Sequence, residues 1–221
     1  MSMHRRVITL VALVLASVSA APALAAQQGS VVLPIADART RTAVEREIAR
    51  AAAKGLPVQP LIAKANEGVA KQASGERIQE AVASLAKRLE QARALLAPSM
   101  SVAELASGAE ALVNGVPAPM LKQIRASWPA ERSVVMPIDV LTELVVRGIP
   151  AKHALEQITA LMRRGATAAQ IASLGQSVQA DVVAGLAPDA ALEVRARGVM
   201  SLLPSPAATA SLAPTGSRPP R

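Results

Sequence analysis

The chain has 221 residues, a formal net charge of +8 at pH 7 and no cysteine, which excludes disulfide bonds and a lipid-modified cysteine. It contains no Phe or Tyr, and Trp128 is its single aromatic residue. This composition argues against a nucleic-acid interface in which bases stack on several aromatic rings.

Residues 1–25 have the layout of a secretory signal peptide. Arg5 and Arg6 supply the positive start, residues 7–20 are mostly apolar, and Ala23-Leu24-Ala25 offers the small side chains that a signal peptidase recognises. An uncleaved anchor is the alternative, but the apolar run is shorter than the roughly 20 residues of a membrane span. The sequence therefore predicts cleavage after Ala25 and a periplasmic or secreted protein exported by the Sec route. The two arginines also leave a twin-arginine route open.

After a loose lead-in at residues 26–39, residues 40–203 are predicted to form one helical domain. Its helices carry recognisable start and stop signals. Thr42 with Glu45 and Ser101 with Glu104 match the capping box, in which a Ser or Thr caps a helix and an acidic residue follows three positions later. Glycines such as Gly55 mark helix ends.

The clearest periodicity lies in the helix that follows Ser74. Its apolar residues alternate spacings of four and three, as in a heptad repeat. Either they pack on other helices of the same domain, or they bind a partner helix or a second copy of the chain. The candidate interaction seam is Ile78, Val82, Leu85, Leu89 and Leu96, with Ala92 between the last two.

The chain also resembles itself. Gly55-Leu56-Pro57 returns as Gly148-Ile149-Pro150, and a similar turn stands at Gly115-Val116-Pro117. In one ungapped register, residues 55–97 and 148–185 read as duplicated helical hairpins, the unit of α-helical repeat arrays. The alternative is that Gly ends and Pro starts are common to helical proteins in general. Residues 204–221 are rich in Pro, Ala, Ser and Thr and are predicted to be disordered.

No pattern indicates chemistry with any specificity. His153 is the one histidine beyond the signal peptide, and a metal site usually needs several ligands on one face. Ser84 and Lys87 match S-x-x-K, but the partner motifs of the serine–lysine enzymes are absent. The sequence predicts no catalytic, cofactor-binding or metal-binding residue.

Together these features predict an all-α protein of helical hairpins, repeat-like in character and not an enzyme. We expect it to act in the cell envelope by binding a protein or by self-association. The alternative is a basic peripheral protein that binds anionic lipid or envelope polymer through Lys and Arg. Neither nucleic-acid binding nor a membrane span in the mature chain is expected.

Overall fold

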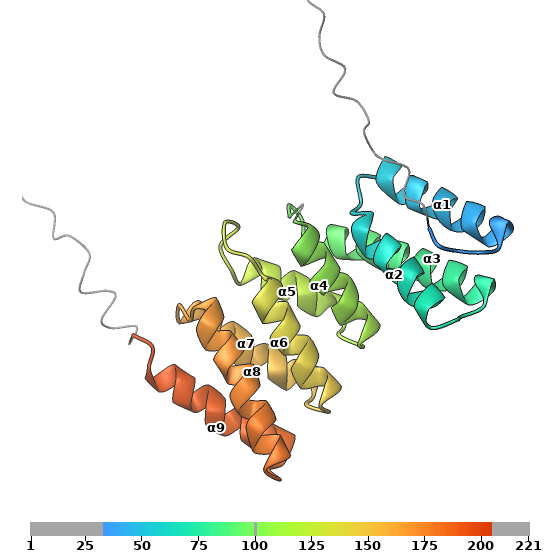
Figure 1. Cartoon of the computed structure of the whole chain (residues 1–221). Helices are drawn as coiled ribbons and strands as arrows, with labels where there is room; N and C mark the ends of the chain where they lie inside the picture. The colour runs from blue at the N-terminus through green and yellow to red at the C-terminus, as the bar shows by residue number, and fades with distance from the viewer. Residues whose placement is uncertain (1–32, 100, 205–221) are drawn as a thin grey trace, which may run out of the picture. The chain divides into compact units, whose positions relative to one another are not determined.

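The computed structural model describes residues 33–99 and 101–204, and every regular element within them is an α-helix (Figure 1). The predicted all-α fold is confirmed for this part of the chain. The predicted signal peptide and residues 205–221 of the predicted disordered tail lie outside the described residues. The helices are α1 (Ala38–Ala53), α2 (Gln59–Ala70), α3 (Gly75–Leu95), α4 (Val102–Val113), α5 (Ala118–Ala126), α6 (Val135–Val146), α7 (Ala151–Arg163), α8 (Ala168–Val183) and α9 (Pro188–Ser201). None of them combines the length and the apolar character needed to cross a membrane.

The start of α1 differs from the prediction. The side chain of Asp37 caps this helix by accepting a hydrogen bond from the amide of Thr40 at 2.7 Å. The predicted cap, Thr42, lies one turn into the helix, and its hydroxyl donates to the carbonyl oxygen of Ala38. Asp is as good an N-cap as Thr, so both Asp37 and Thr42 could begin this helix. The helix begins after Asp37, the earlier of the two.

Helices α3 to α9 pack in two rows. In one row α4 packs on α6 and α6 on α8, and in the other α3 packs on α5, α5 on α7 and α7 on α9 (Figure 1). The two rows are joined because α3 also packs on α4, α6 on α7 and α8 on α9, while α1 and α2 both pack on α3. Helices α4, α6 and α8 begin at Val102, Val135 and Ala168, so their starts are 33 residues apart.

Five of the turns between helices share one geometry. Each contains a glycine with φ between 71° and 99°, a conformation that costs glycine little because it has no Cβ. The amide of the residue after each glycine donates to a carbonyl five residues earlier, which is the Schellman ending of a helix. The glycines are Gly55, Gly115, Gly148, Gly165 and Gly185, and the amide–carbonyl pairs are Leu56–Ala51, Val116–Ala111, Ile149–Leu144, Ala166–Leu161 and Leu186–Asp181, all at 3.0 or 3.1 Å.

The turn after α2 has the same hydrogen bond but no glycine. Gln72 takes the glycine's place with φ of 53°, and the amide of Ala73 donates to the carbonyl of Gly68 at 2.9 Å. This conformation costs a residue with a Cβ about 1–2 kcal/mol. A glycine here would avoid that cost, but it would lose more conformational entropy on folding, so the net gain is smaller.

We therefore expect Gln72→Gly to raise the free energy of unfolding by about 0.5–1 kcal/mol, measured by urea denaturation. Lys71→Gly is the matched control, because Lys71 precedes Gln72 and already has φ of −82°. It should give no gain in stability. An equal gain in both variants would show that the strain at Gln72 is not the cause.

Buried apolar side chains form two clusters. One joins α1, α2, α3 and part of α4, and it includes Leu33 and Ile35, so the end of the predicted loose lead-in belongs to the core. The other extends from Leu96 and α4 to α9. Helices α3 and α4 approach closely where the clusters meet. A Cβ on Gly108 would lie only 2.9 Å from Leu96 Cδ1, so a larger residue would not fit there without a shift. Helix α4 therefore contributes to both clusters.

Candidate functional site

The residues of the candidate interaction seam lie mainly inside the protein. Ile78, Val82 and Leu89 are buried in the cluster that α3 shares with α1, α2 and α4. Leu96 is buried in the second cluster, beside α4. Leu85 is half-buried at the margin of the first cluster. Four of the five side chains are thus covered by the chain's own helices, as in the first of the two interpretations of the heptad spacing.

Ser84 and His153 were the residues considered for catalysis or metal binding, and the structure gives neither a reactive environment. Arg88 Nη1 donates a hydrogen bond to Ser84 Oγ, one turn away on α3. His153, on α7, has acidic neighbours from a second helix. It is half-buried between α7 and α9, with Nδ1 3.1 Å from Asp189 Oδ1 and Nε2 3.7 Å from Glu193 Oε2. Across residues 33–99 and 101–204, no three His, Cys, Asp or Glu side chains are grouped as they would be around a metal ion.

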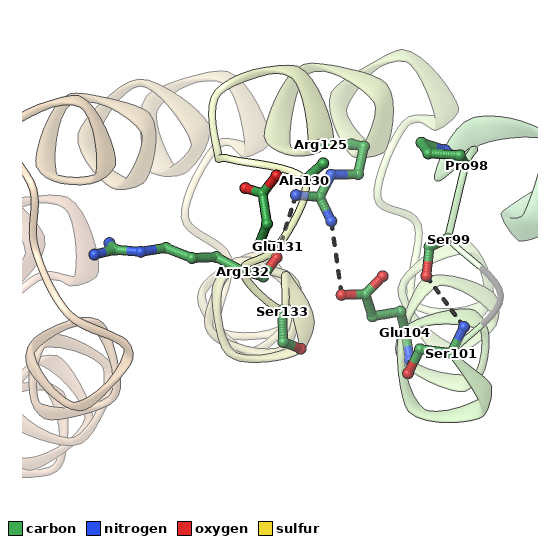
Figure 2. Close-up of a pocket in the computed structure, with 9 residues that line it drawn as sticks. All are labelled: Pro98, Ser99, Ser101, Glu104, Arg125, Ala130, Glu131, Arg132 and Ser133. Atoms are coloured by element: carbon green, nitrogen blue, oxygen red, sulfur yellow. Dashed lines mark hydrogen bonds and ion pairs between the residues drawn. The ribbon is translucent and has the colours of Figure 1, made fainter.

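A depression of about 340 Å³ lies beside the connector between α5 and α6 (Figure 2). Its charged lining is mixed, with Glu104 and Glu131 against Arg125 and Arg132. The rest of the lining is Pro98, Ser99, Ser101, Ala130 and Ser133.

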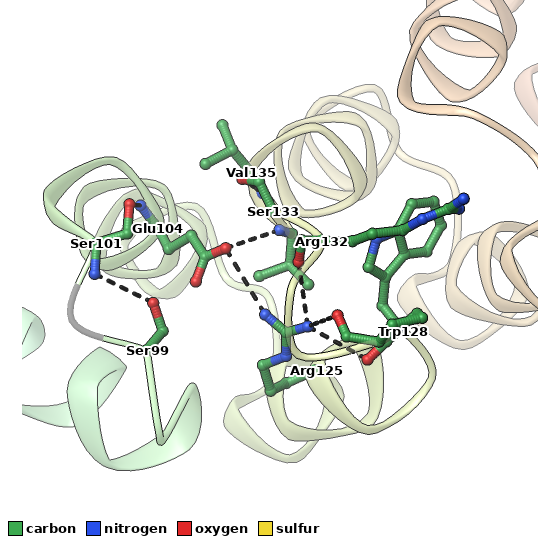
Figure 3. A network of polar contacts seen from close by, with 10 residues as sticks. Ser99, Ser101, Glu104, Arg125, Trp128, Arg132, Ser133 and Val135 are labelled. Atoms are coloured by element: carbon green, nitrogen blue, oxygen red, sulfur yellow. Dashed lines mark hydrogen bonds and ion pairs between the residues drawn. The ribbon is translucent and has the colours of Figure 1, made fainter.

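Glu104 and Arg125 are the charged groups at the base of this depression, and only 5% and 8% of their surfaces are exposed. Arg125 Nη1 lies 3.7 Å from Glu104 Oε1, and the same oxygen accepts a hydrogen bond from the amide of Val134 at 3.0 Å (Figure 3). Ser101 caps α4 as predicted, but Glu104 binds the amide of Val134, the residue before α6, instead of the amide of Ser101. The capping box is therefore only half formed.

Arg125 also organises the connector between α5 and α6. Its Nη2 donates to the carbonyl oxygens of Trp128, Pro129 and Arg132 at 3.2, 2.6 and 3.2 Å. The guanidinium of Arg132 in turn lies 5.3 Å from the centre of the Trp128 ring, a cation–π distance. Since both buried charges are engaged within the chain, we interpret this network as the support of a loop, and the depression as its outer surface.

A second feature is a set of exposed apolar side chains at the ends of stacked helices. Val113, Val146 and Val183 are the last residues of α4, α6 and α8, and they are 51%, 63% and 79% exposed. The turns that follow these three helices lie along one side of the two rows (Figure 1). Leu186, after the third turn, is 43% exposed. We call these four residues the apolar edge.

The apolar edge escaped the sequence analysis, which searched for periodicity within single helices. The available signal was the recurrence of Val two residues before Gly in Val113-Asn114-Gly115, Val146-Arg147-Gly148 and Val183-Ala184-Gly185. Isolated exposed apolar residues are ordinary, but recurrence at one structural position on neighbouring helices is typical of a contact surface. Comparison of the chain with protein-family models, with curated proteins and with solved structures found no match.

Proposed function

We propose that the protein is a non-enzymatic interaction module, built as a helical-repeat array, that binds a protein through its apolar edge. The observation that carries the proposal is the exposure of Val113, Val146 and Val183 at the same position on three stacked helices. Burial of such side chains away from water is favourable, at about 25 cal/mol per Å² of apolar surface. A protein partner that packs on the apolar edge would bury them.

The array itself is supported by two regularities. Helices α4, α6 and α8 start at equal intervals, and the same glycine turn ends five helices. In α-helical repeat proteins each hairpin contacts only its neighbours, and equivalent positions of successive hairpins build extended binding surfaces. Internal duplication of a hairpin would explain both regularities. The matching segments 55–97 and 148–185 have a different offset, 93 residues, and align α2 and α3 with α7 and α8.

Site-specific photo-crosslinking in the producing cells tests the proposal. A photoreactive amino acid in place of Val146 should give an adduct of one defined mass. The yield should fall at least tenfold when Val113→Asp and Val183→Asp are added. Gln123, exposed on α5, is the matched control position and should give no such adduct. Equal labelling at both positions, or none at Val146, would contradict the proposal.

The alternative, a peripheral protein that binds anionic lipid or polymer, draws on the net charge of +8. Many of the cations, however, are already paired within the chain. Lys64 and Lys71 both contact Glu67, at 2.6 and 2.5 Å, and together lower the pKa of that carboxyl to about 2. Further pairs are Lys54–Glu90, Arg147–Glu143, Arg195–Asp181 and Arg197–Glu193. Binding to anionic vesicles that weakens steeply between low and physiological salt would favour this alternative over the first.

We further propose that residues 1–25 direct export and are removed. The mature protein should then begin at Ala26, or within a few residues of it, when material from the envelope fraction is sequenced from its N-terminus. Ala25→Arg should block cleavage, because the peptidase requires a small residue there. Recovery of the unsubstituted protein with Met1 intact would rule out this proposal.

A further inference from the structure

Helix α9 carries apolar residues on two opposite faces. Its inner face buries Ala191, Leu192 and Ala196. Its outer face presents Ala190, Val194 and Gly198, and Leu202 follows at the same interval of four residues directly after the helix. The four residues form one slanted stripe. Val194 is 53% and Leu202 78% exposed. A helix that is apolar on both faces is typical of one covered on both sides. Among residues 33–99 and 101–204, only the inner side of α9 is covered, by α7 and α8.

The outer stripe borders an apolar depression of about 240 Å³ between α8 and α9. Gly198 and Leu202 belong to both features, and Leu174, Ser177, Arg195 and Val199 complete the lining of the depression. In the part of the chain that the structure describes, a Cβ on Gly198 would have no atom within 4 Å, so the backbone of α9 is open to close approach at this point. The surface therefore has both a projecting part and a recess.

We propose that a second copy of the chain covers this face, with the two α9 helices antiparallel across a two-fold axis. The inference goes beyond the proposed function, because the partner is a second copy and the surface is separate from the apolar edge. The stripe alternates small and large side chains, and an antiparallel pairing brings Ala190 opposite Leu202 of the second copy. The same register brings Val194 opposite Gly198 of the second copy. A two-fold interface uses the same surface on both copies, so that surface must be complementary to itself. The stripe meets this condition when the two copies are antiparallel.

The charges beside the stripe also fit this arrangement. On one flank Glu193 and Arg197 lie one turn apart and pair at 2.9 Å. In the antiparallel register each can also approach the oppositely charged residue of the second copy. On the other flank Arg195 forms two hydrogen bonds of 2.6 Å to Asp181, which lower the pKa of that carboxyl and leave a neutral pair facing the second copy. Pairing of both flanks favours association, since like charges left facing each other would oppose it.

Sedimentation equilibrium of the mature chain tests the association. The wild-type chain should dimerise, and Val194→Glu should weaken the dimer at least about 100-fold, because one carboxylate from each copy would be buried near the axis. Val146→Glu is the matched control, since it makes the same change on the apolar edge, and it should leave the dimer intact. A wild-type chain that stays monomeric at every concentration, or equal weakening by both variants, would overturn the inference.

Because the chain has no cysteine, disulfide trapping tests the register. An equimolar mixture of Val194→Cys and Gly198→Cys chains should form a linked heterodimer on mild oxidation. A mixture of Ala190→Cys with Gly198→Cys should link at least tenfold less. Efficient linking of Val194→Cys to itself would overturn the antiparallel register.

The two proposals can fail separately. If the chain is monomeric while the photo-crosslink at Val146 persists, the α9 interface is wrong and binding through the apolar edge stands. If the chain dimerises but Val146 gives no crosslink, the α9 interface stands and binding through the apolar edge is wrong.

Discussion

Arg125→Ala is expected to lower the free energy of unfolding by about 3–5 kcal/mol, the largest loss we expect from a single substitution. The change removes the guanidinium that lies 3.7 Å from Glu104 and that binds three carbonyl oxygens of the α5–α6 connector. Glu104, only 5% exposed, would be left as a buried charge with one hydrogen bond to the amide of Val134. Urea denaturation measures the loss against a total stability of about 5–15 kcal/mol for a domain.

A double-mutant cycle separates the ion pair from the support of the connector. Glu104→Gln keeps an oxygen that can accept from Val134, so it should cost less than Arg125→Ala. Addition of Glu104→Gln to Arg125→Ala should recover part of the loss, because the unpaired carboxylate is gone. The coupling energy between the two sites should be about 0.5–3 kcal/mol. Strict additivity would show that Arg125 acts only through the three carbonyls.

Leu89→Ala is expected to cost about 2–5 kcal/mol, the usual range for removing a fully buried Leu side chain. Leu89 is fully buried in α3, within the cluster shared by α1, α2 and α4. Leu85→Ala is the matched control from the same seam, and it should cost clearly less because Leu85 is half-buried. Both variants are measured by thermal unfolding at two protein concentrations.

Neither substitution in α3 should alter the sedimentation behaviour of the folded chain, since Leu89 is covered by the chain's own helices. If Leu85→Ala abolished association without loss of stability, the seam would be an interface after all. Equal costs at the two positions would show that burial does not set the energetics of α3.

The parts of the fold that sequence analysis predicted well are those that depend on neighbouring residues. The glycine turns at Gly55, Gly115 and Gly148 were identified because a positive φ favours glycine whatever the distant contacts of the residue are. Ser101 caps α4 as expected, and the helix predicted after Ser74 begins at Gly75 with Ser74 as its cap, since a cap involves residues three positions apart. The start of α1 was misplaced because Asp37 and Thr42 are both acceptable caps, and the burial of Leu33 and Ile35 depends on distant helices.

The functional surfaces were harder to predict because they depend on contacts far apart in the sequence. Glu104 looked like half of a capping box, but it binds the amide of Val134, 30 residues later. The heptad spacing of α3 predicts an apolar face equally well for a core helix and for an interface helix. The outer face of α9 could not be distinguished from its inner face until the packing of α7 and α8 against the inner one was known.

Amide hydrogen exchange at increasing protein concentration tests most directly whether the protein works through exposed helix faces rather than through its heptad seam. Protection of the α9 amides, residues 188–201, should rise with concentration as the second copy covers them. Protection of the α3 amides, residues 75–95, should be high throughout and independent of concentration. A concentration-dependent change in α3 with none in α9 would contradict the proposed use of exposed helix faces.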